Sequence, residues 1–216
     1  MITYKPVRRM LMAAFCSLAV TFAAARVGAA GDTFNQSAHL GKRTAKTSAA
    51  VDKYVAQLGK TEQALSLVSP AQDKGSKKRY ESFSREVNKL EKAQKHATSA
   101  IDKMKSTGTE YFSSWDKSIA QMSNPELRQA SAERRSKIMK DHDELAATLT
   151  DIASQLQPFM SNLHDLKAFL GPDLSPANVD RASEMIQKSQ ADARALKDKI
   201  AGVQTTLKLF LSEAPK

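Results

Sequence analysis

Residues 138–170, with the sequence IMKDHDELAATLTDIASQLQPFMSNLHDLKAFL, carry the pattern that decides the fold of this chain. Within them, a series of positions is separated alternately by four and three residues, and all but one are apolar. This spacing places the side chains on one face of a helix, as in the seam of a coiled coil. The positions are Ile138, His142, Leu145, Leu149, Ile152, Leu156, Phe159, Leu163, Leu166 and Leu170.

The same alternation recurs in two other long segments, and a shorter seam precedes them. Long seams joined by short connections predict helices that pack as antiparallel neighbours. The further long seams consist of Tyr80, Phe83, Val87, Leu90, Gln94, Ala97, Ile101, Met104, Tyr111 and Trp115, and of Val179, Ala182, Ile186, Ser189, Ala193, Leu196, Ile200, Val203, Leu207 and Phe210. The short seam consists of Val51, Val55, Leu58 and Leu65.

Capping residues mark where these helices begin and end. Asn124-Pro125-Glu126 supplies an N-cap, a proline at the first helical position and a negative charge near the positive end of the helix dipole. Ser175-Pro176 repeats the cap and the proline, and Gly171-Pro172 ends the preceding helix. The predicted helices span residues 45–68, 77–122, 124–170 and 175–213.

The sequence therefore predicts an all-α protein, an elongated antiparallel helical bundle or coiled coil of three long helices plus one shorter N-terminal helix. Residues 45–216 are expected to form a single helical-bundle domain, preceded by a mobile N-terminal segment over residues 31–44. Only 8 Gly and 7 Pro occur among the 216 residues, which leaves too few turn formers for a sandwich, a barrel or a β/α array.

The N-terminus has the pattern of a secretory signal peptide. Basic residues precede an apolar run from Met10 to Ala25, and the small residues Val27-Gly28-Ala29-Ala30 follow. The run is shorter than the roughly 20 residues that cross a bilayer. We expect residues 1–30 to form a signal peptide that is removed by cleavage after Ala29 or Ala30, and the protein to be periplasmic, without an integral membrane span after cleavage. Cleavage after Ala25, or retention of the segment as an anchor, is the alternative.

Charge and cysteine content follow from this assignment. The whole chain has 33 Lys plus Arg, 23 Asp plus Glu and a formal net charge of +10. Part of the basic excess lies in the predicted signal peptide, as does Cys16, the only cysteine. The exported protein could therefore form no disulfide, and thiol catalysis and cysteine-ligated zinc are excluded.

Three stretches of this chain together resemble one known family. They are Tyr111–Gln121 (YFSSWDKSIAQ), Asn124–Leu127 and Gln157–Phe169. Their order and spacing are similar to those of a bacterial envelope family catalogued as domain of unknown function 2959, over roughly residues 80–213. The resemblance implies an exported, all-helical protein with no assigned activity, although the connection at Gly171-Pro172-Asp173 has no counterpart that we can match.

Some relatives of that family carry names that suggest DNA-repair ATPases. This chain contains no G-x-x-x-x-G-K-[ST] phosphate loop, so the sequence does not support nucleotide binding. The four histidines form neither H-E-x-x-H nor Glu-x-x-His, which leaves no metal or cofactor to predict. We expect no enzymatic activity. His142 alone occupies a seam position, where it would fix the helix register beside Met104 and Val203 or point its ring tip to solvent.

Basic residues gather on the outward face of the second predicted helix. Their spacing again alternates between four and three, and the line includes no carboxylate. It predicts a candidate polyanion-binding stripe for a phosphate or carboxylate polymer, anionic lipid or an acidic partner. The alternative is a solvated face balanced by neighbouring acids. We expect no binding of nucleic acid, because export separates the protein from it. The stripe consists of Lys78, Arg85, Lys89, Lys92, His96 and Lys103, with Ser82 and Ser99 between them.

The connection between the second and third predicted helices is the other unusual place. Aromatic residues there face arginines instead of aliphatic side chains, so stacking of arginine on the rings could seal the bundle end. Alternatively, the same residues form a candidate partner-docking tip, since tryptophan and arginine are enriched in binding hot spots. These residues are Tyr111, Phe112, Trp115, Arg128 and Arg135.

From these features we expect a non-enzymatic exported coiled-coil protein that acts as a binding or spacer module in the bacterial envelope. Its partner would be an envelope protein or an anionic polymer or lipid. The alternative function is a peripheral binder of anionic lipid or cell-wall polymer, acting through the basic stripe.

Overall fold

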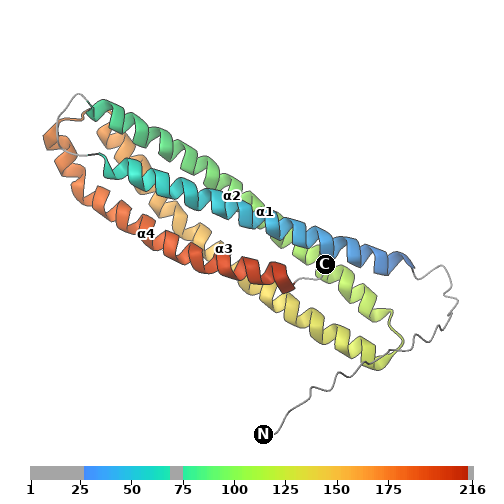
Figure 1. Cartoon of the computed structure of the whole chain (residues 1–216). Coiled ribbons are helices and arrows are strands. Elements are labelled where there is room, and N and C mark those ends of the chain that lie inside the picture. Colours follow the sequence, from blue (N-terminus) through green and yellow to red (C-terminus); the bar gives the residue numbers. More distant parts are fainter. Residues whose placement is uncertain (1–26, 69–74, 214–216) are drawn as a thin grey trace, which may run out of the picture.

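The protein is an elongated antiparallel bundle of helices. The structure, a computed structural model, describes residues 27–68 and 75–213, which form the helices α1 (Val27–Ser66), α2 (Ser76–Ala120), α3 (Pro125–Leu170) and α4 (Pro176–Glu213). Consecutive helices pack side by side and α4 returns to α1, so each helix has two neighbours (Figure 1). No strand occurs in the described ranges. The predicted all-α bundle is confirmed.

The predicted seams form the core of this bundle. Every predicted seam position of α3 and α4 is buried, including the polar residues His142 and Ser189. On α2 the seam is also buried, except that Tyr80 and Gln94 are only partly covered. Asn124 caps α3 as expected, since its side chain accepts a hydrogen bond from the backbone N–H of Leu127. Apolar periodicity therefore located three of the helices closely.

The first helix differs from the prediction. α1 is 40 residues long, slightly longer than α4, so the expected shorter N-terminal helix is wrong. Residues 31–44 are helical, and within them Leu40 and Thr44 are 1% and 0% exposed, so the prediction of a mobile segment there does not hold. The actual seam of α1 is Ser37, Leu40, Thr44, Thr47, Val51, Tyr54, Leu58, Thr61, Leu65 and Val68.

Hydroxyl groups explain why this seam was difficult to recognise. Thr44 donates to the carbonyl of Leu40, one turn back, and Thr61 does the same to Gln57. A threonine that satisfies its hydroxyl within its own helix can be buried at little cost and packs with its methyl group. Polar residues therefore occupy seam positions that a search for apolar residues passes over.

The predicted signal peptide lies mostly outside the described residues. Residues 1–26 are not described, and the expected cleavage positions after Ala29 and Ala30 fall in the first turn of α1. Cleavage and export therefore stay predictions. Among the described helices, none has a stretch that is long and apolar enough to span a membrane.

α1 and α2 form the most closely packed pair of helices. Thr47 Oγ1 donates to the backbone oxygen of Ala100 at 3.0 Å, and Thr61 Oγ1 donates to that of Glu86 at 3.2 Å. Side chains this short reach a neighbouring backbone only when the two helices approach closely. Small residues such as Ala50 and Ala97 on the facing surfaces allow that approach.

Candidate anion-binding groove

The predicted stripe on α2 is a continuous exposed line. Each of Lys78, Arg85, Lys89, Lys92, His96 and Lys103 is exposed to solvent. Heptad spacing keeps all six on one side of the helix, away from its buried seam. The structure therefore places these residues as the sequence indicated, although their role in binding stays a prediction.

α1 supplies a second cationic line beside the first. Arg43, Lys46 and Lys53 of α1 lie across from His96 and Lys103 of α2, and together they line a groove of about 400 Å³. The floor of this groove consists of small residues, namely Ala49, Ala50, Ser99 and Ala100. We call this feature the cationic groove.

Sequence reasoning missed the α1 side of the groove, because Arg43 precedes the predicted start of the first helix at residue 45 and because the pairing of Lys46 and Lys53 with α2 depends on helix packing. A signal was present nonetheless. The basic residues Arg43, Lys46, Lys53 and Lys60 fit one alternating series of three and four residues, the same periodicity as the stripe on α2. Close packing of α1 on α2 brings the two series together.

The cationic groove contains no compensating acid. No aspartate or glutamate is among its lining residues. Within the described part of the chain, none of its five cationic or titratable side chains forms an ion pair with a carboxylate, whereas Lys95 and Lys188 elsewhere on the surface do. Like charges held together on a folded surface raise the local potential, which attracts anions. The groove is therefore a candidate site for an anion.

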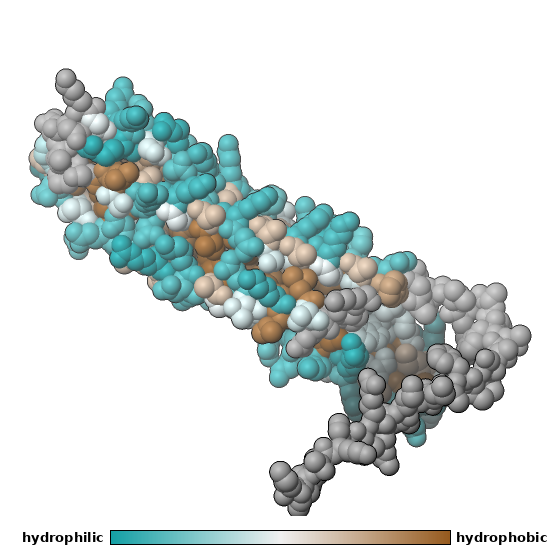
Figure 2. Space-filling view, viewed as in Figure 1, coloured by the Kyte–Doolittle hydropathy of each residue, from teal (hydrophilic) through white to brown (hydrophobic). Residues whose placement is uncertain are grey.

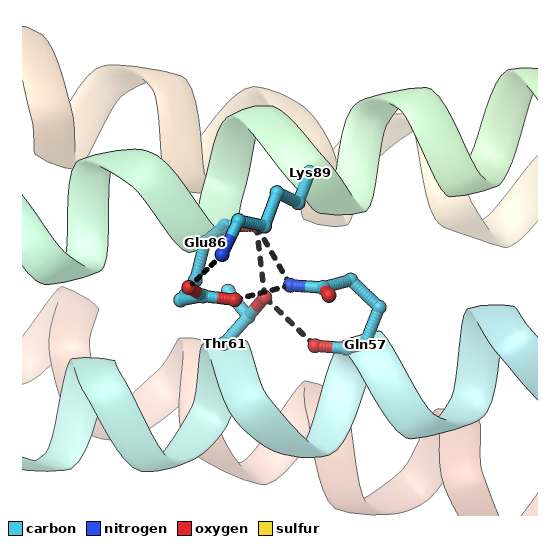
Figure 3. Close-up of polar contacts among 4 residues, drawn as sticks. All are labelled: Gln57, Thr61, Glu86 and Lys89. Carbon is cyan, nitrogen blue, oxygen red and sulfur yellow. Dashed lines mark hydrogen bonds and ion pairs between the residues drawn. The ribbon is translucent and has the colours of Figure 1, made fainter.

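A polar cluster ends this uncompensated region (Figure 3). Glu86 of α2 forms an ion pair with Lys89 at 2.7 Å and accepts a hydrogen bond from Gln57 of α1, also at 2.7 Å. Hydrogen bonds from Lys89 and then from Gln57 lower the pKa of Glu86 below its ordinary value, although burial acts in the opposite direction. The carboxylate is thus ionised at neutral pH and offsets the charge of Lys89. The uncompensated positive charge is therefore not uniform along the predicted stripe, and it is greatest in the cationic groove.

The second predicted site, at the α2–α3 end, is mainly a packed aromatic cluster. Tyr111, Phe112 and Trp115 are all buried, and the ring centroid of Tyr111 lies 5.1 Å from that of Phe112 and 5.4 Å from that of Trp115. Arg135 lies over Phe112, with 5.6 Å from Cζ to the ring centroid. Of the five residues of the predicted docking tip, only Arg128 is exposed, and Arg135 is partly covered.

Hydrogen bonds hold this cluster across the α2–α3 interface. The indole N–H of Trp115 donates to Ser131 at 3.0 Å, and Arg135 pairs with Asp116 at 2.6 Å. The buried rings and the arginine stacked on Phe112 are the features that the predicted sealing of the bundle end requires. The partner-docking role of these residues stays a prediction.

His142 is buried at the centre of the bundle, where it was expected at a seam position. Its ring lies 5.5 Å from the ring of Phe112 and 6.0 Å from that of Phe210, and the predicted proximity to Met104 and Val203 stays a prediction. Nδ1 lies 3.1 Å from a carboxylate oxygen of Asp143. The described residues contain no group of three or more His, Cys, Asp or Glu placed to hold a metal ion.

Fold and groove together define an all-α bundle protein with a cationic surface. Comparison with protein families is consistent with that class and more specific: residues 39–213 match a family described as Protein of unknown function (DUF2959), so the chain belongs to this family. The match begins near residue 39, well before the predicted start near residue 80, and thus takes in most of α1. No curated protein and no solved structure matches the chain.

Proposed function

We propose that this protein is a non-enzymatic, exported binding module of the bacterial envelope, and that its cationic groove holds a linear anionic polymer. The observation that carries the proposal is the meeting of Arg43, Lys46 and Lys53 with His96 and Lys103 around a groove without carboxylates. The periplasmic location rests on the signal-like N-terminus.

The geometry of the groove favours a polymer. Lys46 and Lys53 are seven residues apart, as are His96 and Lys103, so basic side chains recur along each wall about every 10 Å. A chain with regularly placed phosphates or carboxylates can lie along the groove and meet cations from both sides. Each contact releases condensed counterions, which makes binding strong at low salt and weak at high salt.

The bundle also has the dimensions of a spacer. α2 has 45 residues and therefore extends about 70 Å. A polymer bound along α1 and α2 would leave α3 and α4 accessible to other envelope components. Binding and spacing are therefore compatible roles for one rigid body.

The test compares two triple charge reversals in a protein comprising residues 31–216. One carries Lys46→Glu, Lys53→Glu and Lys103→Glu in the groove; the control carries Lys117→Glu, Lys140→Glu and Lys208→Glu, all exposed elsewhere. Both variants change the net charge equally. Binding to fluorescent linear polyphosphate, between about 50 and 300 mM salt, should fall by more than tenfold for the groove variant alone. Equal losses in the two variants would contradict a specific groove.

Anionic lipid is the alternative ligand. The exposed line on α2 continues past the groove through Lys92, Arg85 and Lys78, and such a line could lie along a flat charged surface. Co-sedimentation with vesicles containing phosphatidylglycerol distinguishes the two. Vesicle binding that depends on Arg85 and Lys92, together with failure to bind polyphosphate, would assign the function to membranes.

A further inference from the structure

The fourth helix stops before the other three at one end of the bundle. In Figure 1, α4 ends while α1, α2 and α3 continue toward the α2–α3 connection. The position of this end follows from contacts along α4: Gln204 bonds Asp52 of α1, and Lys199 bonds Gln155 of α3. The same register places Glu213 level with Arg43 of α1 and Asp141 of α3.

The sides of α1 and α3 that face α4 continue beyond this point. On α1, Glu62 accepts hydrogen bonds from Arg194 and Lys197 of α4 and so marks the side of α1 that faces α4. Steps of seven residues toward the N-terminus stay on this side and reach Gly41 and then Phe34. On α3, the same reasoning leads from Gln155 to Arg134 and Leu127. Beyond the end of α4, Phe34, Leu127 and Arg134 are exposed and Gly41 is partly exposed.

Two large apolar side chains are exposed there. Phe34 is 63% exposed and Leu127 is 64% exposed, the largest values among the exposed large hydrophobic residues of the described chain. Ala38 and Ala130 are exposed on the same two sides. We call Phe34, Ala38, Gly41, Leu127, Ala130 and Arg134 the three-helix surface. Figure 2 views the molecule from the direction of Figure 1, with α1 and α4 on the near side.

A well-packed floor supports this surface. Tyr111 of α2 is buried beneath the exposed sides of α1 and α3. Its hydroxyl forms a hydrogen bond with Ser37 of α1 and interacts electrostatically with Arg134 of α3. Thr33 of α1 bonds Ser118 of α2 at 2.7 Å, which holds the start of α1 in place. α1 and α3 themselves do not pack together. The three-helix surface therefore consists of the exposed sides of two helices, α1 and α3, that are both held by α2.

We propose that the three-helix surface binds an acidic amphipathic helix of a partner protein, which lies against α1 and α3 in line with α4. A helix in this position would cover Phe34 and Leu127 with its apolar side. Arg134 is exposed and is the only charged residue among the six that define the surface, so the charge there favours an acidic partner, and Asp141 lies only at the end of the surface nearest α4. From Leu127 to Asp141 this side of α3 is about 20 Å long, which matches about four turns of a bound helix.

This proposal does not depend on the polymer-binding function. The cationic groove lies on the side of α1 that faces α2, whereas the three-helix surface includes the side that faces α4. It also changes the position of the predicted docking tip. The buried aromatic rings support the surface from below, and the exposed sides of α1 and α3 contact the partner.

The test uses a synthetic peptide of about 18 residues as the probe, with leucine at seam positions and glutamate on both flanks. Binding of the fluorescent peptide to residues 31–216 is followed by anisotropy. We expect Phe34→Ser and Leu127→Ser each to weaken binding by about tenfold or more, since apolar anchors dominate such contacts. Leu67→Ser and Phe169→Ser, exposed outside this surface, are the matched controls and should bind as wild type does.

Charge provides the second measurement. Arg134→Glu should weaken binding of the glutamate peptide and strengthen binding of a peptide with lysine in place of glutamate. Failure of wild type to bind, equal binding of both peptides, or equal losses in the control variants would overturn the proposal. Self-association of the protein that Phe34→Ser abolishes would assign the surface to a second copy, which also overturns it. All the substituted residues are exposed, so thermal melting should show each variant folded.

Discussion

His142 of α3 lies with its Nε2 edge directly against Gly108 of α2, and the two fit together because position 108 has no side chain. A Cβ added at Gly108 would overlap both Nε2 and Cε1 of His142. The ring is buried, and its Nε2 has no hydrogen-bond partner within the described structure. Gly108 therefore occupies a helix interior for a steric reason, although glycine is a poor helix former.

Gly108→Ala should therefore destabilise the protein. Overpacking against the ring costs about 1–3 kcal/mol, which outweighs the gain of up to about 1 kcal/mol in helix propensity. In a His142→Ala background the overlap disappears, so the same change should become neutral or stabilising. Urea unfolding of the four proteins in this cycle measures the coupling. Stabilisation by Gly108→Ala in the presence of His142 would contradict the contact.

Tyr54→Phe should stabilise the protein or leave its stability unchanged. The ring of Tyr54 is buried in the core, and its hydroxyl has no hydrogen-bond partner in the described structure. Burial raises the pKa of this hydroxyl well above its ordinary value, which reflects the same lack of solvation. Removal of a buried unsatisfied group is expected to gain about 1 kcal/mol. Tyr80→Phe is the control and should lose stability, because the Tyr80 hydroxyl donates to the carbonyl of Lys167 at 2.9 Å.

Glu62→Gln should lower stability at neutral pH by about 1 kcal/mol, and the difference should disappear in acid. Burial acts to raise the pKa of Glu62, but hydrogen bonds and charge from Lys197 and Arg194 outweigh it and lower the pKa. A carboxylate with a lowered folded-state pKa contributes stability at neutral pH and loses it as the pH falls through that value. Melting temperatures from about pH 7 to pH 3 test this. Glu184→Gln, at an exposed position, should show no such dependence.

Leu40→Ala should cost about 2–4 kcal/mol because it opens a cavity beneath α1. Lys42→Ala, two residues away and exposed, should have almost no effect. The comparison tests whether the first part of α1 belongs to the folded core. Urea denaturation measures the stability of both variants. Equally small losses would indicate that residues 31–44 form a mobile segment.

The core of α3 and α4 could be predicted position by position because leucine, isoleucine and valine occupy most of its buried sites. α1 could not, since Ser37, Thr44 and Thr47 interrupt the apolar pattern. Their hydroxyls find partners only once helices form and pack: Thr47 needs both Arg43 of its own helix and Ala100 of α2. A search that admits serine and threonine at seam positions follows the alternation without interruption from residue 37 to residue 68.

Of the cationic groove, only the α2 side could be predicted from the sequence, because the α1 side depends on helix packing. The cations of α2 share one helix, so spacing alone aligns them. Arg43 and Lys53 join them only through the pairing of α1 with α2, which neither segment specifies by itself. The ion pair that offsets Lys89 likewise depends on how Gln57 of α1 orients Glu86. Sequence spacing indicates which charges share a face, whereas packing decides which of them remain uncompensated.

The hydrogen bonds from Thr47 and Thr61 to the backbone of α2 also restrict how this bundle can transmit force. Two helices with heptad seams can slide by seven residues, about 10 Å, and again match apolar with apolar side chains. Such a slide would separate Thr47 from Ala100 and Thr61 from Glu86, and it would split the cluster around Glu86. α1 and α2 therefore move as one rigid unit. A force along the axis of one helix is transmitted to the other without sliding between them.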